Sequence, residues 1–275
     1  MLIVQLTDPH ICAAGAVSNQ ASPTNMLATR AFRAVAAMNP RPDAVLITGD
    51  LTENGLAAEY ANFALLARDL SPLPVFVIPG NHDRRETLRA ALAHLPGVTA
   101  DPAYVQYAVE DHPVRLIMVD TIVPGAAHGE LRPEQRDWLD RTLAEAPRKP
   151  TLLAMHHAPF DCGITHMDKV RLRDADALAA ILARHRQVQR VVCGHHHRTM
   201  FTGFAGIVAS VAPGMAHQIE LRLDPGARGM WNFEPPAFHL HRWTEAGGFV
   251  THTGFVENFP GPYPFVASPD YPGRA

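Results

Sequence analysis

Short apolar runs alternate with longer amphipathic segments through the first two-thirds of the chain. The runs are typical of buried strands and cover residues 2–7, 44–48, 75–78, 151–155 and 188–193. The segments between them repeat apolar side chains at helical spacing, which predicts helices near residues 24–38, 57–70, 84–95, 133–143 and 175–185. Strands that alternate with helices form parallel or mixed sheets covered on both faces. The pattern therefore predicts an α/β fold.

Two stretches depart from this alternation. Residues 104–109 and 114–119 are β-rich runs joined by a short polar link, and they predict a hairpin. After His197 several strand-like runs follow without a strong helical pattern, over residues 200–211, 218–223, 238–243 and 248–256. We expect these runs to form a second sheet. The last twenty residues are rich in proline, glycine and aromatic side chains, which predicts a C-terminal cap or interaction segment.

Composition narrows the class of protein. The chain has 275 residues, of which 47% are hydrophobic and 19% charged, and this suits one large folded domain. The net charge of −3 gives no basic excess, so we expect no binding of extended nucleic acid. Cys12, Cys162 and Cys193 are scattered, which argues against a disulfide framework. Every apolar run is shorter than the ~20 residues that span a bilayer, and no signal peptide is evident. These features predict a cytoplasmic protein without membrane association.

Candidate chemistry is concentrated where the strands end. Five strands are followed by side chains that bind transition metals: Asp8 and His10, Asp50, Asn81 with His82, His156, and His195 with His197. Open α/β sheets bind ligands outside the carboxyl ends of their strands, so these residues are expected to gather at one edge. A single Asp at a strand end is usually a turn or a helix cap, and a single His usually packs. Five such ends in succession are hard to explain by chance, and they predict a metal site.

The spacing of these residues resembles a known family. Together with His156, four segments are similar to the full motif set of the calcineurin-like metallophosphoesterases: Asp8-x-His10, Gly49-Asp50-x-x-x-x-Gly55, Gly80-Asn81-His82-Asp83 and Gly194-His195-x-His197. Further segments are similar to the bacterial branch that holds class III cyclic-nucleotide phosphodiesterases and glycerophosphodiesterases: Arg41–Val45, Glu59-Tyr60, Val77–Asp83 and Pro213–Gln218. The resemblance covers nearly the full length of the chain.

The resemblance implies a fold and a cofactor. The implied fold is a four-layer α/β/β/α sandwich, with a metallophosphoesterase domain over residues 1–257 and a C-terminal cap or oligomerisation tail over residues 258–275. The implied cofactor is a pair of divalent transition-metal ions, and mixed nitrogen and oxygen ligands suit Fe, Mn, Zn or Co. By resemblance, Asp8, His10 and His197 bind one metal, Asn81, His156 and His195 bind the other, and Asp50 bridges the two.

The same resemblance implies roles in catalysis. Two metals lower the pKa of a bound water and clamp a phosphoryl group, so that a metal-activated hydroxide attacks phosphorus. Asp50 and His82 are the expected catalytic residues, with His82 as phosphate donor or general acid. His82, Asn81 and His217 are the expected substrate-binding residues.

For several residues next to the predicted ligands we expect supporting or structural roles. Glu53 and Asp83 are expected to orient His82 or a metal ligand. His157 and His196 each adjoin a predicted ligand, and in an extended chain they should point away from it into packing contacts. The aromatic segment from residue 255 to 271 could cover its own surface or cap the site of a neighbouring subunit, since the branch implies a homo-oligomer.

The expected activity is hydrolysis of a small phosphodiester, either a glycerophosphodiester or a cyclic nucleotide. The alternatives are a phosphomonoesterase or a nuclease of the same superfamily, and a metal-free interaction scaffold. A nuclease would usually carry a basic strip, and a scaffold would be expected to lose ligands, whereas all seven are present here. Similar protein phosphatases carry Asp-Arg-Gly where this chain has Glu53-Asn54-Gly55, which argues against protein phosphatase activity.

Overall fold

The computed structural model describes residues 1–265, and its framework is two β-sheets. The first sheet has five strands in the order β13-β12-β1-β2-β3. Its strands are β1 (Leu2–Leu6), β2 (Ala44–Thr48), β3 (Val75–Ile78), β12 (Ala237–Thr244) and β13 (Gly248–Phe255). β1, β2 and β3 run parallel, and the two late strands pair antiparallel at the other edge of β1.

The second sheet has six strands in the order β4-β5-β6-β7-β9-β8. Its strands are β4 (Tyr107–Val109), β5 (Arg115–Val119), β6 (Thr151–Met155), β7 (Val188–Cys193), β8 (Met200–Phe204) and β9 (Ile207–Val211). β5, β6, β7 and β9 run parallel. The predicted hairpin is confirmed, because β4 and β5 pair antiparallel.

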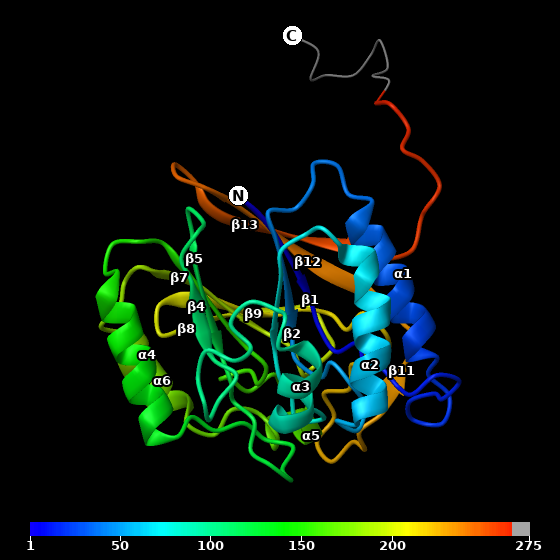
Figure 1. The fold of residues 1–275 in the computed structure, drawn as a ribbon, viewed down its shortest axis with the longest axis horizontal. Coiled ribbons are helices and arrows are strands. Elements are labelled where there is room, and N and C mark those ends of the chain that lie inside the picture. The colour runs from blue at the N-terminus through cyan, green and yellow to red at the C-terminus, as the bar shows by residue number, and fades with distance from the viewer. Residues whose placement is uncertain (266–275) are drawn as a thin grey trace.

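Helices cover the outer face of each sheet (Figure 1). Those beside the first sheet are α1 (Thr24–Ala36), α2 (Ala57–Leu66) with a 3₁₀ turn (Ala67–Leu70), and α3 (Arg85–Leu92). Those beside the second sheet are α4 (Pro133–Glu145) and α6 (Ala175–Leu182), and a short helix, α5 (Thr165–Asp168), lies between β6 and α6 in sequence. The order of layers is therefore helix, sheet, sheet, helix, which confirms the predicted α/β sandwich.

The alternation of side chains along β5 shows how the layers are held together. Ile117 and Val119 belong to the outer core and pack in one cluster with Leu139 of α4. Leu116 and Met118, one step along the strand, belong to the larger core shared with the first sheet. Because successive strand residues face opposite ways, a single fully apolar strand fills both layers.

The strands after residue 197 do not form a sheet of their own, so this prediction was wrong. β8 and β9 extend the sheet of β7, whereas β12 and β13 extend the sheet of β1. The run 200–211 folds back on itself at Ala205 and Gly206, both of which have positive φ angles. Only Gln218–Ile219 of the run 218–223 is a strand, β10, and it pairs with β11 (Trp231–Asn232) in a separate ribbon. Sequence periodicity identifies strands but not the neighbouring strands with which they pair, because that pairing depends on long-range packing.

Other expectations concern the cysteines, the membrane and the tail. Cys12, Cys162 and Cys193 are all free, as expected. Within residues 1–265 no helix combines the length and apolar character that crossing a membrane requires. Of the expected tail, residues 258–265 are described and expose Phe259 and Tyr263, whereas residues 266–275 lie outside the described part of the chain.

Candidate metal centre

The predicted ligands meet where the carboxyl ends of five strands from both sheets converge. Asp8 and His10 follow β1, Asp50 follows β2 and Asn81 follows β3 of the first sheet, while His156 follows β6 and the pair His195 and His197 follows β7 of the second. We expected one edge of one sheet, but the residues lie at the seam between two. Backbone hydrogen bonds join neighbouring ends, from His10 to Asp50 and from Gly194 to His156.

One carboxylate oxygen lies between two groups of ligand atoms. Asp50 Oδ2 is 3.6 Å from His10 Nε2 and 3.4 Å from His156 Nε2. On the His10 side, possible ligand atoms of Asp8, His10, Asp50 and His197 all lie within 4.8 Å of one another. On the other side, His156 Nε2 is 3.2 Å from Asn81 Oδ1. The structure therefore brings the predicted bridging residue between the two predicted half-sites.

The histidine tautomers leave lone pairs facing the centre. In three cases the Nδ1–H donates to a fixed oxygen: His10 to Glu53 Oε2 (2.9 Å), His156 to the Thr48 carbonyl (2.8 Å), and His197 to the His217 carbonyl (2.9 Å). With Nδ1–H held in this way, each ring would offer Nε2 as an acceptor once that nitrogen gives up its proton to a bound cation. The Nε2 atoms of His10 and His197 are only 3.2 Å apart, and His197 Nε2 is 3.2 Å from Asp8 Oδ1. Several acceptors that converge in a buried place fit a bound cation.

His195 belongs to the second group. Its Nε2 is buried and has no hydrogen-bond partner among the described residues. Its ring centroid is 5.0 Å from that of His156. Burial of an unpaired ring nitrogen costs free energy unless a ligand satisfies it, so this atom also fits a metal.

The backbone at these strand ends is strained. Five of the seven predicted ligands have left-handed φ angles: Asp8 (55°), His10 (46°), Asp50 (48°), His195 (69°) and His197 (47°). Non-glycine residues rarely adopt this conformation, at a cost of roughly 1–3 kcal/mol each, and such residues cluster at functional sites. A sharp turn after the strand points the side chain back across the strand end, which is why ligands from separate strands can meet.

Glycines allow the close approach of these turns. A Cβ atom on Gly194 would lie 2.1 Å from Thr7 Oγ1 and 2.9 Å from Asp8 Oδ2. A Cβ atom on Gly80 would lie 2.2 Å from Asp50 Oδ1. The glycines of the sequence motifs thus have a steric cause, since any side chain there would displace a predicted ligand.

The two carboxylates of the centre are held in their ionised form. Burial alone would raise the pKa of Asp8, but the adjacent His197 outweighs it and lowers the pKa to about 2. Burial also opposes ionisation of Asp50, yet His156 and His82 bring its pKa well below the ordinary value. Buried carboxylates stay ionised only when positive charge lies nearby. Two ionised carboxylates in a buried place are in turn the electrostatic condition for binding a cation.

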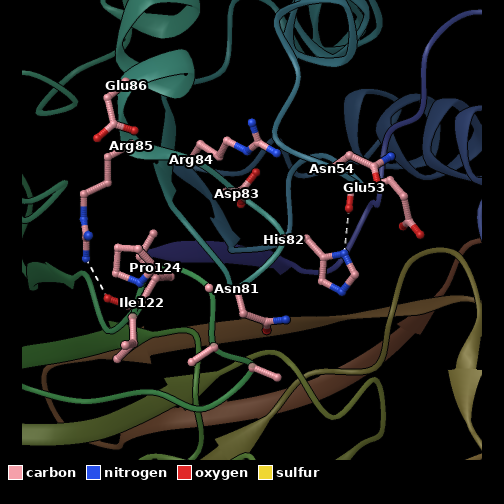
Figure 2. A pocket seen from close by; sticks show the side chains of 14 residues that line it. Glu53, Asn54, Asn81, His82, Asp83, Arg84, Arg85, Glu86, Ile122 and Pro124 are labelled. Carbon is pink, nitrogen blue, oxygen red and sulfur yellow. Dashed lines mark hydrogen bonds between the residues drawn. The ribbon is translucent and has the colours of Figure 1, made fainter.

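His82 lies beside the centre with a fixed orientation. Its Nδ1–H donates to the Glu53 carbonyl oxygen at 2.7 Å, and its backbone N–H donates to Asp50 Oδ1 at 2.9 Å. Figure 2 shows the side chains of Asn81 and His82 projecting from the same side of their segment. Burial would lower the pKa of His82, but the charge of Asp50 outweighs it and raises the pKa above its ordinary value.

Glu53 and Asp83 have different partners. Glu53 orients both His10, through its carboxylate, and His82, through its carbonyl, as expected. Asp83 acts on the predicted ligands through the backbone next to them, since its carboxylate contacts neither the His82 ring nor a predicted ligand side chain. It accepts hydrogen bonds from backbone and side-chain donors of the adjacent loops: Leu51, Thr52, Tyr60 and Gly80. Asp83 thereby fixes the loops that carry Asp50 and Asn81.

His157 and His196, which adjoin predicted ligands in sequence, differ in whether they join a possible metal-binding group. The expectation that His157 points away was wrong, since its ligand atom lies with those of His156 and His195 in a possible metal-binding group. Its Nδ1 is hydrogen-bonded to Thr121 Oγ1 at 2.8 Å. His196 belongs to none of these groups, although its ring centroid lies 5.3 Å from that of His195, and burial lowers its pKa to about 4.

Comparison with known proteins shows the family. A family model described as calcineurin-like phosphoesterase matches residues 1–199, well over half of the chain. The chain belongs to this family. The family is metal-dependent, and its identification confirms the resemblance seen in the motifs.

Relatives in this phosphoesterase family are similar over most of their length. A protein of Arcobacter nitrofigilis named "Probable glycerophosphodiester phosphodiesterase" is 35% identical over 266 residues, covering 96% of this chain and 97% of the relative. A protein of Rhodopseudomonas palustris named "Probable cyclic nucleotide phosphodiesterase" is 34% identical, covering 92% and 91%. The 3′,5′-cyclic adenosine monophosphate phosphodiesterase of Escherichia coli K12 is 32% identical, covering 72% and 70%.

Solved structures agree with the phosphoesterase fold. A dimetal phosphatase from Danio rerio superimposes with a TM-score of 0.65 at 14% identity, covering 94% of this chain and 99% of that one. At this identity the likeness concerns the fold alone.

Two cavities flank the centre of this phosphoesterase, and both are lined in part by Asn81 and His82. The first, of about 560 Å³, is called the Arg84 cavity and is further lined by Glu53, Asn54, Asp83, Arg84, Arg85, Glu86 and residues 122–127 (Figure 2). The second, of about 320 Å³, is called the Trp231 cavity and contains His10, Asp50 and His217 together with His166, Met230 and Trp231. His217 lines this cavity, and its ring nitrogen also lies with those of His10 and His197 in a possible metal-binding group. No sequence motif pointed to Arg84, His166 or Trp231, because each lies outside the strand-end pattern.

Proposed function

We propose that this protein is a binuclear-metal phosphodiesterase that hydrolyses small phosphodiesters, either glycerophosphodiesters or cyclic nucleotides. The observation that carries the proposal is the position of Asp50 Oδ2 between His10 Nε2 and His156 Nε2. A carboxylate between two converging sets of acceptors suits a pair of cations, and paired cations are the usual means of phosphoester hydrolysis in such sites. The names of the relatives support a diester as substrate.

The residues present fit a metal pair. Asp8, His10 and His197 would hold one divalent ion, Asn81, His156 and His195 the other, and Asp50 would contact both. When bound, the two ions supply Lewis acidity to the phosphoryl oxygens and acidify the attacking water. The donor set of imidazole, carboxylate and amide groups suits Fe, Mn, Zn or Co.

His82 would act on the substrate rather than on a metal. Since its Nδ1–H is held by the Glu53 carbonyl, the proton available to a substrate is on Nε2. Burial lowers the pKa of His82 and the charge of Asp50 raises it, with a net rise above the ordinary value. A protonated His82 can donate to a phosphoryl oxygen and then to the departing ester oxygen, which is the role of a general acid.

The surroundings support a small diester over the alternatives. Two cavities beside the same Asn81 and His82 give room for a group on each side of phosphorus, whereas a monoester has only one such group. The net charge of −3 gives no support to a nuclease. Assembly into a homo-oligomer and a cytoplasmic location stay predictions from the sequence.

Hydrolysis of bis-p-nitrophenyl phosphate tests the proposal. The chelator-treated protein, reloaded with Mn, Co or Zn, should hydrolyse this diester faster than p-nitrophenyl phosphate. Asp50→Asn should abolish turnover and lower the metal content below two ions per chain. Asp137→Asn, at an exposed position of α4, is the matched control and should behave like the parent protein. No diester turnover with any of these metals would refute the proposed activity, and an unchanged metal content in Asp50→Asn would refute the bridging role.

A further inference from the structure

The Trp231 cavity has an apolar wall that the proposed chemistry does not use. The wall comes from the ribbon β10–β11 and consists of Ile219, Met230 and Trp231. The side chain of Met230 is 48% exposed, and Trp231 is half-buried. Large apolar side chains at the opening of a polar metal centre suggest a ligand group that covers them.

Aromatic neighbours fix the position of the Trp231 ring. Its centroid lies 5.2 Å from that of His217, with 57° between the planes, and 5.1 Å from that of Phe233, with an angle of 86°. The His217 ring lies in turn 5.4 Å from the His10 ring. The indole is therefore separated from a predicted metal ligand by a single imidazole, and a group on the reacting phosphate can reach it.

The ribbon loop is seated against the opposite wall. A Cβ atom on Gly229 would lie 2.9 Å from His166 Cδ2 and 3.2 Å from His166 Nε2, so a side chain at this position would have to displace the His166 ring. His166 belongs to α5, and Met167 and Val170 line the cavity beside it. The cavity is thus bounded on two sides by side chains that offer mainly apolar surface.

The two cavities differ in chemistry. The Arg84 cavity combines the apolar residues 122–127 with Asn54, Arg84 and Glu86, whose polar groups suit a hydroxylated or charged substituent, and no phenylalanine, tyrosine or tryptophan within residues 1–265 lines it. The Trp231 cavity instead places a flat indole and a flexible thioether next to the phosphate position. Aromatic rings favour stacking with other planar rings over contact with a small polyol.

We propose that Trp231 is a specificity-determining residue that stacks on the planar ring of a nucleoside ester. The inference rests on the proposed phosphodiesterase function and selects, within it, phosphates that carry a nucleobase. Base-to-aromatic stacking of this kind changes affinity about tenfold or more on removal of the aromatic ring. Glycerol esters lack a planar ring and gain nothing from the indole.

Binding of three phosphates to the metal-loaded protein tests this inference by calorimetry. The probes are adenosine 5′-monophosphate, glycerol 3-phosphate and inorganic phosphate, and the proteins are the parent, Trp231→Ala and Trp231→Phe. Trp231→Ala should weaken adenosine monophosphate binding about tenfold and leave the two other phosphates within twofold. Trp231→Phe should restore most of the lost affinity, because phenylalanine keeps a stacking face. Metal content and circular dichroism of each variant serve as controls for folding.

Two results would overturn the inference. One is a parent protein that binds adenosine monophosphate no more tightly than inorganic phosphate. The other is a Trp231→Ala variant that weakens all three probes equally, since a structural role of the ribbon would produce that outcome. Because these are binding measurements, they are independent of turnover of bis-p-nitrophenyl phosphate, and failure of the phosphodiesterase proposal is observed separately.

Discussion

Arg85 of α3 and Asp120, which follows β5, form a buried ion pair between the two halves of the sandwich. Arg85 Nε donates to Asp120 Oδ2 at 2.7 Å, and its terminal nitrogen donates to Asp120 Oδ1 at 2.8 Å and to the Ile122 carbonyl at 2.7 Å. The Asp120 side chain is fully buried and that of Arg85 is 11% exposed. In Figure 2 Arg85 extends toward Ile122, at one wall of the Arg84 cavity.

Arg85→Met should lower the free energy of unfolding by about 3–5 kcal/mol, because removal of one partner leaves a buried carboxylate without its countercharge. Among residues 1–265, only the backbone N–H groups of Val105 and Ile122 would still donate to the Asp120 carboxylate. Three lost hydrogen bonds to charged groups would sum to roughly 5–9 kcal/mol, and relaxation of the structure with entry of water to the unpaired carboxylate reduces this loss. Arg85→Lys keeps the charge without the bidentate geometry and should cost about half as much.

Urea unfolding of the chelator-treated variants, followed by circular dichroism, measures these differences. A double-mutant cycle with Asp120→Asn should give a coupling free energy of about 2–3 kcal/mol. Additive effects of the two substitutions, or a loss below about 1 kcal/mol for Arg85→Met, would refute the reasoning. If Arg85→Met does not fold, the smaller loss of unfolding free energy expected for Arg85→Lys is measured instead.

Two further predictions concern histidines with opposite roles. His82→Ala should slow hydrolysis of a glycerophosphodiester by about 100-fold or more. It should slow hydrolysis of bis-p-nitrophenyl phosphate far less, because p-nitrophenolate departs without a proton. Equal losses with both substrates would exclude His82 as the general acid. His239 of β12 is fully buried with both ring nitrogens unpartnered among residues 1–265, and burial lowers its pKa to about 4. In the unfolded chain the His239 ring binds a proton below about pH 6.5, whereas in the folded protein it does so only near pH 4. The free energy of unfolding therefore falls as the pH drops from about 6.5 to about 4. His239→Leu should reduce the loss of unfolding free energy between pH 7 and pH 5 by about 2 kcal/mol. Urea titrations of the chelator-treated proteins at both pH values measure this effect, and an unchanged pH dependence would contradict it.

The part of the site that follows a local rule could be predicted from the sequence. Asp8, Asp50 and His156 each follow an apolar run, and the rule that ligands lie at strand ends is enough to bring them together. The strand positions themselves were predictable, because buried runs of β-branched and apolar residues bounded by polar turns have few other interpretations.

The rest depends on contacts that periodicity does not encode. The pairing of β12 with β1 joins Arg242 to Leu2, and nothing in either segment specifies the other. The partners of Asp83 also escaped prediction, because Leu51 and Gly80 offer backbone N–H groups that every residue but proline possesses. Trp231 lies on a two-residue strand, which is too short to give a pattern.

The central place of β1 also bears on how the molecule is made. This strand lies between β2 and β12, so β1 acquires its second neighbour only when residues 237–244 emerge. Until then one side of β1 presents unpaired N–H and C=O groups, the kind of edge that recruits other chains. A fragment ending at residue 199, where the family match ends, would carry every predicted ligand and still leave this edge open. Contacts so far apart in sequence form slowly, so the turn that carries Asp8 and His10 is anchored by a strand from a much later part of the chain.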